Sequence, residues 1–178
     1  WNIESLIYAS QKLKNRKALD LACELFFLHP FDYNQGIWRR VEPDGEILSI
    51  DTTFNHQLWF AASVGLAGKE NTEISNRINR FIEKLSNNWE TAHNGRIIHP
   101  LLTGKKRKLQ ENVKRFIKPK YKKEITLKEI GYQTFNLYAF AMLIEAGFRF
   151  NDYIFKNIKK SVSFMLSEEF KSQINLTK

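Results

Sequence analysis

The chain has 178 residues, of which 43% are hydrophobic and 13% aromatic, and its formal net charge is +9 at neutral pH. This length is near that of one ordinary domain, and the composition is sufficient for a substantial core. The single cysteine excludes an intrachain disulfide, and neither a membrane-spanning apolar stretch nor a signal-type leader is visible. We therefore expect one soluble domain over residues 1–178, in the cytoplasm, with no membrane partner; the oligomeric state stays open.

The first predicted elements are helical. The pattern of residues 3–28 is typical of a helix that is interrupted near Asn15 and ends before His29-Pro30. Residues 31–51 follow with Gly36, Pro43, Asp44 and Gly45 and a short apolar alternation. This composition predicts a long structured loop and is compatible with a small hairpin.

A pair of helices is predicted next. Residues 54–66 are apolar or small nearly all round, which is typical of a helix buried on several sides. Residues 73–85 carry apolar side chains every three or four positions with polar residues between them, which predicts a helix with one wet face. The pair therefore consists of an inner and an outer helix, and residues 87–102 then form a second long structured loop.

The excess charge is concentrated in residues 103–130. This basic insertion contains eleven Lys or Arg and three Glu, so the rest of the chain is nearly neutral. It is interpreted either as a solvated insertion or as a surface that tracks an anionic polymer. Within it, Leu109, Val113, Phe116 and Ile117 have helical spacing, which favours a short basic amphipathic helix that is also suited to an acidic membrane surface.

A second pair of helices repeats the first. Residues 134–166 align with residues 53–86, beginning with TFN in both segments, and they contain an inner helix over 135–146 and an outer helix over 152–166. The inner helices are each followed by a glycine for which we expect a left-handed conformation, Gly68 and Gly147. Side-chain oxygens available to cap the outer helices belong to Asn71 or Thr72 and to Asn151 or Asp152.

These features, with the stretches TFNHQLWFAA and YQTFNLYAFA, resemble the six-hairpin glycosidase-like superfamily of (α/α) toroids, which includes unsaturated glucuronyl hydrolases and sugar 2-epimerases. The resemblance implies an all-α array of antiparallel helical hairpins, a partial (α/α) toroid with two long structured loops. A complete toroid needs about twice this length, so the resemblance implies a half-toroid or a fragment. It implies a carbohydrate-active protein, either a glycoside hydrolase or lyase-like enzyme or a binding protein, acting on an oligosaccharide or polysaccharide, with uronic acid-containing sugars as one possibility.

In that superfamily, the loops before the inner helices and the first turns of those helices form the substrate funnel. The resemblance therefore implies that Asp51 and His56 are catalytic. It places substrate-binding residues in both repeats, namely Trp38, Arg39, Arg40, Asn55, Gln57, Tyr132, Gln133 and Asn136.

The residue types leave alternatives open. Asp51 suits an acid or base but equally suits a plain helix cap, and His56 suits a proton shuttle but also a satisfied core position. Glycoside cleavage generally needs a second carboxyl group, for which the loops offer Asp32, Asp44, Glu46 and Glu90. No Gly-rich phosphate loop, esterase elbow or zinc-binding spacing is present, so we expect neither a cofactor nor a metal.

A rival hypothesis is that the chain is a non-catalytic binding domain. A helical repeat domain of this kind would bind nucleic acid or an acidic partner through residues 105–123. The two hypotheses predict different surfaces, because the enzyme needs Asp51, His56 and Arg39 or Arg40 around one pocket, whereas the binding domain needs a continuous basic face.

Overall fold

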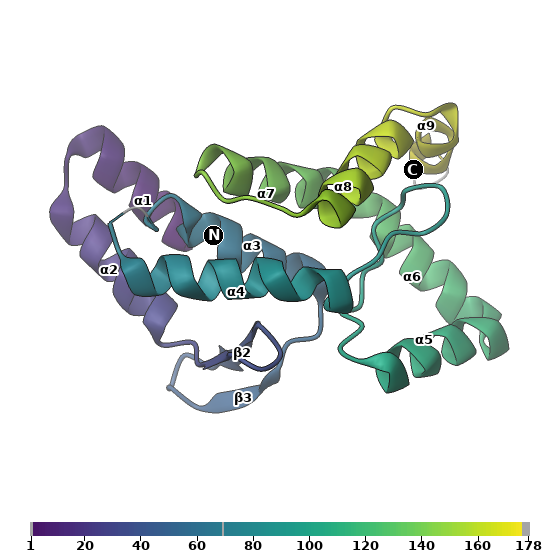
Figure 1. The fold of residues 1–178 in the computed structure, drawn as a ribbon, viewed down its shortest axis with the longest axis horizontal. Helices are drawn as coiled ribbons and strands as arrows, with labels where there is room; N and C mark the ends of the chain where they lie inside the picture. The colour runs from purple at the N-terminus through teal and green to yellow at the C-terminus, as the bar shows by residue number, and fades with distance from the viewer. Residues whose placement is uncertain (1, 69, 176–178) are drawn as a thin grey trace. The chain divides into compact units, whose positions relative to one another are not determined.

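The computed structural model describes residues 2–68 and 70–175. In this part, the chain is mainly α-helical, as predicted, with nine helices and one small sheet (Figure 1). None of these helices is both long enough and apolar enough to cross a bilayer. The described residues form two compact units: the first holds 2–51, 56–68, 70–84 and 139–149, and the second holds 52–55, 85–138 and 150–175.

The first unit opens with two paired helices, α1 (Asn2–Leu13) and α2 (Arg16–Phe27) (Figure 1). The predicted interruption near Asn15 is confirmed, because the side chain of Asn15 accepts a hydrogen bond from the backbone N–H of Ala18 and caps α2. An asparagine favours this position because its amide oxygen satisfies a backbone donor that the first helical turn leaves open.

A small antiparallel sheet occupies the first predicted loop. Its order is β1 (Phe31–Asp32), β2 (Ile37–Val41) and β3 (Ile47–Ile50). The tip between β2 and β3 contains Gly45 at φ +91°, a left-handed conformation that glycine adopts without a steric penalty. The apolar alternation in this stretch therefore reports a real hairpin.

Two helices lie where the first pair was predicted, α3 (Phe54–Gly65) and α4 (Thr72–Asn88). Asn71 caps α4 by accepting from the backbone N–H groups of Glu73 and Ile74. The core of the first unit includes a cluster of aromatic rings with centroids 5.2–5.8 Å apart, made by Phe26, Trp38, Phe60 and Phe81.

The expectation for Gly68 is wrong. Gly147 has φ +95°, as predicted, but Gly68 does not have a positive φ. Instead α3 ends in a tight turn in which Ala67 and Gly68 donate to the carbonyls of Val64 and Gly65. Glycine is still favoured there, because a Cβ atom would lie 3.0 Å from the hydroxyl oxygen of Ser75.

The second unit contains the first residues of α3, the last turn of α4 and all or part of five later helices. The basic insertion forms α5 (Lys105–Ile117) and α6 (Pro119–Gly131), which contact each other. The other helices are α7 (Gln133–Glu145), whose first turns belong to this unit, α8 (Asp152–Met165) and α9 (Glu168–Asn175).

The second predicted loop is held in place by backbone pairing. Phe54 donates to the carbonyl of His99 over 2.8 Å, and Leu101 donates to the carbonyl of Thr52 over 2.8 Å. The ring of Phe54 stacks on the ring of Trp89, with centroids 5.4 Å apart. The loop is therefore an ordered part of the second unit.

Candidate functional site

A pocket of about 230 Å³ lies in the first unit where β2 meets the first turns of α3. It brings together six of the ten residues that the sequence assigns to a site. The lining is His29, Trp38, Arg39, Arg40, Val41, Glu42, Asp51, His56, Gln57 and Phe60.

The polar centre of this pocket is a pair of side chains. The Nδ1 atom of His56 lies 2.7 Å from a carboxylate oxygen of Asp51. The Asp51 side chain is 17% exposed and that of His56 is 60% exposed, so the carboxylate is sheltered while the imidazole reaches solvent. The hydrogen bond to Asp51 raises the pKa of His56 above its ordinary value, although partial burial and the charge of Arg40 oppose the shift.

This contact fixes the roles of the two imidazole nitrogens. When Nδ1–H donates to a carboxylate, the other nitrogen, Nε2, is the one left to accept or donate a proton. A histidine held in this way by a sheltered acid matches the base–orienter arrangement found in many enzyme active sites. The arrangement can therefore move a proton to or from a molecule in the pocket.

Gln57 forms the inner wall of the pocket. Its amide accepts from the backbone N–H of Trp38 over 2.8 Å and donates to the Trp38 carbonyl over 2.9 Å. It also donates to the Asp51 carbonyl over 3.0 Å. One buried side chain thus ties β2 and the segment before α3 together, and this contact positions both Asp51 and the strand that carries the arginines.

Trp38 lies beside the pocket but is 2% exposed. Its ring packs against Phe31 and Phe60 with centroid distances of 4.7 and 5.4 Å. The aromatic ring therefore stabilises the floor of the pocket, while Phe60, one turn after His56, supplies a further apolar wall.

Arg39 and Arg40 supply positive charge at the same pocket. Arg39 donates through Nε to the Leu48 carbonyl and Arg40 donates through a terminal nitrogen to the Ser49 hydroxyl, each over 3.2 Å. A guanidinium group has five N–H donors, so each arginine retains donors for an anionic ligand. The anchoring bonds hold both groups against the hairpin.

The remaining four predicted residues belong to the second unit. Gln133 is fully buried and accepts from the backbone N–H of Ile97, and Tyr132 stacks its ring on that of His99. Asn55 and Asn136, at matching positions of the repeat, are 5% and 1% exposed, and their amide oxygens have no hydrogen-bond partner among the described residues.

Four lining residues were not identified from the sequence, namely His29, Val41, Glu42 and Phe60. Glu42 is exposed at the end of β2 and provides a second carboxylate beside Asp51, and His29 hydrogen-bonds the Arg39 carbonyl and packs on Phe60. The only sequence signal for Glu42 is its place directly after the strand that carries the arginines. In the described part of the chain, no three His, Cys, Asp or Glu side chains are arranged to hold a metal ion.

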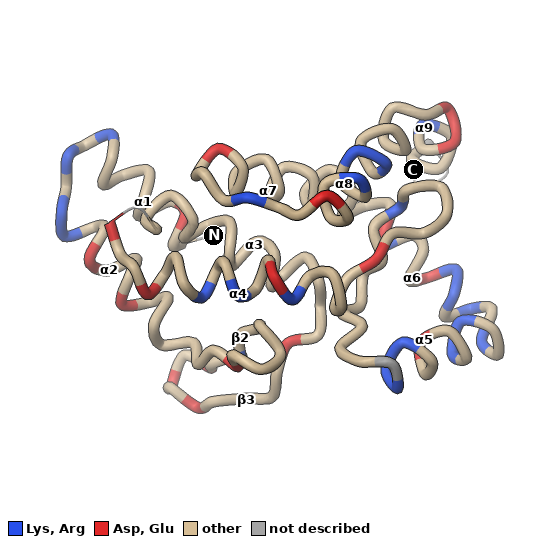
Figure 2. Tube along the Cα trace, in the orientation of Figure 1, with Lys and Arg blue, Asp and Glu red and all other residues tan. Residues whose placement is uncertain are grey.

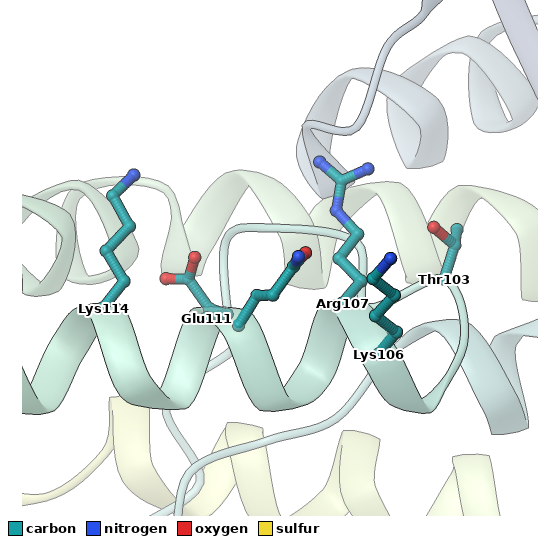
Figure 3. Close-up of a pocket in the computed structure, with 6 residues that line it drawn as sticks. Thr103, Lys106, Arg107, Glu111 and Lys114 are labelled. Atoms are coloured by element: carbon teal, nitrogen blue, oxygen red, sulfur yellow. The ribbon is translucent and has the colours of Figure 1, made fainter.

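A second concave surface lies along α5 in the second unit. This groove has a volume of about 560 Å³ and is polar and mainly cationic (Figure 3). Figure 2 shows a concentration of basic residues along α5 and the start of α6, with further ones on α8. The groove is lined by Thr103, Lys106, Arg107, Gln110, Glu111 and Lys114.

An ion-pair network joins α5 to α6. Glu129, whose side chain is fully buried, accepts from Arg115 over 2.5 Å and from Arg96 over 2.9 Å. Glu111 pairs with Arg115 and accepts from the hydroxyl of Tyr121 over 2.8 Å. Burial, together with this hydrogen bond, raises the pKa of Tyr121 to about 12. The basic insertion is therefore two anchored helices.

Comparison with known proteins gives one informative similarity. No protein-family model matches the chain, and no solved structure matches it. Over 187 aligned residues, the chain is 35% identical to archaeal glycosylation protein Q of Haloferax volcanii, and the alignment covers 96% of this chain and 50% of that protein. The chain is thus similar to a protein named for glycosylation, and it spans about half the length of this curated relative.

Proposed function

We propose that the chain binds and processes an oligosaccharide that contains a uronic acid, at the pocket around Asp51 and His56. The observation that carries the proposal is the 2.7 Å contact between these two side chains in a pocket that Arg39 and Arg40 also line. The substrate class is supported by the similarity to a protein named for glycosylation.

The proposed chemistry is proton transfer by His56. Asp51 accepts from Nδ1–H and keeps the imidazole oriented, so that Nε2 exchanges a proton with the sugar. Because the contact with Asp51 raises the pKa of His56, a larger share of the imidazole is protonated near neutral pH than in an isolated histidine. One arginine pairs with the uronate carboxylate and holds the sugar in register.

This arrangement favours proton transfer at carbon over direct hydrolysis. Hydrolysis of a glycoside generally uses two carboxyl groups that flank the bond, one as acid and the other as base or nucleophile. Here Asp51 is sheltered and engaged by His56, and Glu42 is the one other carboxylate among the lining residues. We therefore place elimination next to a uronate carboxylate ahead of hydrolysis. In this step neutral Nε2 takes the proton from the carbon beside the carboxylate, a carbon–carbon double bond forms as the bond to the leaving glycosyl oxygen on the next carbon breaks, and that oxygen takes the proton from Nε2–H.

The wider architecture is part of the same proposal. Two matched pairs of inner and outer helices, α3–α4 and α7–α8, support a partial (α/α) toroid. The chain also covers half of its relative, which supports a longer protein of which this is one part. The remaining hairpins of this longer protein complete the proposed toroid.

The test is a binding and turnover screen with uronic acid-containing and neutral oligosaccharides. We expect turnover of a uronate-containing sugar, and we expect His56→Ala to lower it about 10²–10⁴-fold, as for loss of a general acid or base. His93→Ala, which removes an exposed histidine of the second unit, is the matched control and is expected to retain activity.

Two results would overturn the proposal. One is an absence of binding to every sugar of the panel by a chain that is folded. The other is unchanged binding and turnover in both His56→Ala and Asp51→Asn. If single-stranded nucleic acid binds at low salt while no sugar does, the rival function through residues 105–123 replaces it.

A further inference from the structure

The helix α5 exposes its apolar face. Leu109, Val113 and Phe116 recur every three or four residues and Ile117 lies four residues after Val113, so all four lie on one side of the helix. Their exposed fractions are 66%, 46%, 88% and 66%. These four residues, which we call the α5 stripe, form a row of large apolar side chains in contact with water.

The inward side of α5 is polar, the reverse of an ordinary amphipathic helix. Ion pairs of Arg115 with Glu129 and of Lys108 with Glu90 hold it to the rest of the unit. Tyr121 of α6 adds a hydrogen bond to Glu111, and its ring centroid lies 3.7 Å from the Lys114 ammonium. No side chain of α5 that the structure describes is fully buried. A helix normally turns its apolar face to the core, so an anchored helix with the opposite orientation presents that face to something outside the described residues.

The charge around the α5 stripe restricts which kind of partner can bind there. The helix α5 contains six Lys or Arg in thirteen residues and a single acidic residue. That acid, Glu111, pairs with Arg115 and also lines the groove, so the groove carries three cationic side chains and one carboxylate. Lys106 and Lys114 border the groove that runs beside the stripe, and side chains from the groove project from one side of α5 (Figure 3).

We propose that α5 lies in the surface of an anionic lipid membrane. The α5 stripe enters the boundary between headgroups and acyl chains, and the groove beside it takes anionic headgroups through Lys106, Arg107 and Lys114. Four to eight basic residues on an amphipathic helix are typical of this mode of binding. This contact is peripheral, because no described helix spans a bilayer.

A membrane accounts for both properties of α5. Nucleic acid complements the lysines but offers no apolar medium for the aliphatic residues of the stripe, and an apolar protein surface covers the stripe but gives the lysines no partners. Anionic lipid supplies both, because its headgroups carry the charge and its acyl chains accept the apolar side chains. The sequence analysis predicts no membrane partner. That prediction does not use the exposed fraction of each residue of α5, because only the structure gives it.

The test is flotation of the full chain with phosphatidylcholine vesicles that contain about 30% phosphatidylglycerol. We expect binding to these vesicles, little binding to pure phosphatidylcholine, and weaker binding as salt is added. The double substitution Leu109→Ser and Phe116→Ser should lower the partition coefficient about tenfold or more. The control is Leu13→Ser, which removes a leucine that is 74% exposed on α1 and should leave binding unchanged.

A charge-reversal pair separates the electrostatic part. Lys106→Glu and Lys114→Glu together should also lower binding about tenfold, whereas Lys12→Glu and Lys17→Glu, on exposed positions of the first unit, should have a smaller effect. Circular dichroism of each variant verifies that the helices are retained. A folded wild-type chain that does not float with anionic vesicles overturns the proposal, as does unchanged binding of the Leu109/Phe116 variant. Stripe-dependent self-association, or binding of nucleic acid without lipid, also overturns it, since another occupant then covers α5.

Discussion

At the scale of single residues, the contact between His56 and Asp51 makes a prediction about pH. The hydrogen bond to Asp51 is the largest cause of the raised pKa of His56, while partial burial and Arg40 act in the opposite direction. Replacing Asp51 with Asn removes the raising contribution and leaves the lowering ones. We therefore expect the pKa of His56 to lie above its ordinary value of 6.5 in the natural chain and to fall in Asp51→Asn.

Titration of the histidine ring protons by NMR measures this pKa, and His56→Ala assigns the resonance among the four histidines. Asp44→Asn, at the exposed tip of the hairpin, is the matched control. The sign for stability follows from linkage: a histidine whose pKa is raised on folding stabilises the fold fully below pH 6.5 and loses that contribution as pH rises through the raised pKa. An unchanged pKa in Asp51→Asn would show that the contact does not hold the imidazole in solution.

At the scale of elements, Glu129 is the residue on which the position of α5 depends. Its carboxylate is fully buried and pairs with Arg96 from the second loop and with Arg115 from α5. It also accepts from the backbone N–H of His99. Glu129→Gln removes the charge and places N–H donors against the two arginines. We expect the free energy of unfolding to fall by about 3–5 kcal/mol, as when one partner of a buried pair is lost.

Denaturation in urea measures this change, and Glu124→Gln provides the control. Glu124 lies on the same helix but is exposed, so its replacement should alter the free energy of unfolding by no more than about 0.5 kcal/mol. Equal stability of the two variants would mean that the arginines find other partners and that the network does not anchor α5.

The elements also illustrate what sequence pattern predicts. Helical periodicity located α3, α4, α7 and α8 within three residues at each end, because an apolar face recurs with the helical repeat. It did not reveal that α5 turns its apolar face outward. The hydrophobic pattern of a helix is the same whichever of its faces packs against the core. For α5, the face that packs inward is set by ion pairs between residues on different helices, such as Arg115 and Glu129.

The residues of the candidate pocket also divide into those that the sequence brings close and those that only the fold brings together. Asp51, His56 and Gln57 lie within seven residues at the start of an apolar helix, so the sequence itself brings them close. Arg39 and Arg40 come to the same pocket because Gln57 binds the backbone of Trp38, a contact across nineteen residues that no local pattern encodes. Glu42 was missed for the same reason.

At the scale of the whole molecule, charge and chemistry are carried by different units. The net charge of +9 comes almost entirely from residues 103–130 in the second unit, whereas the Asp51–His56 pocket belongs to the first. Sugar processing and lipid binding, as proposed above, use separate sets of residues. Substitution of one set then leaves the other function intact, because sites that share no residues and no contacts behave almost independently.

The prediction is a double dissociation. His56→Ala should lower sugar turnover about 10²–10⁴-fold and leave the vesicle partition coefficient within about twofold of the natural chain. Leu109→Ser with Phe116→Ser should lower vesicle binding about tenfold and leave sugar turnover within about twofold. Both assays are run on the same preparations, with thermal unfolding to verify that each variant is folded. Loss of both functions in either variant would contradict this separation. It would indicate that sugar and lipid are parts of one ligand, because a single amphiphilic molecule would contact both the pocket and the α5 stripe.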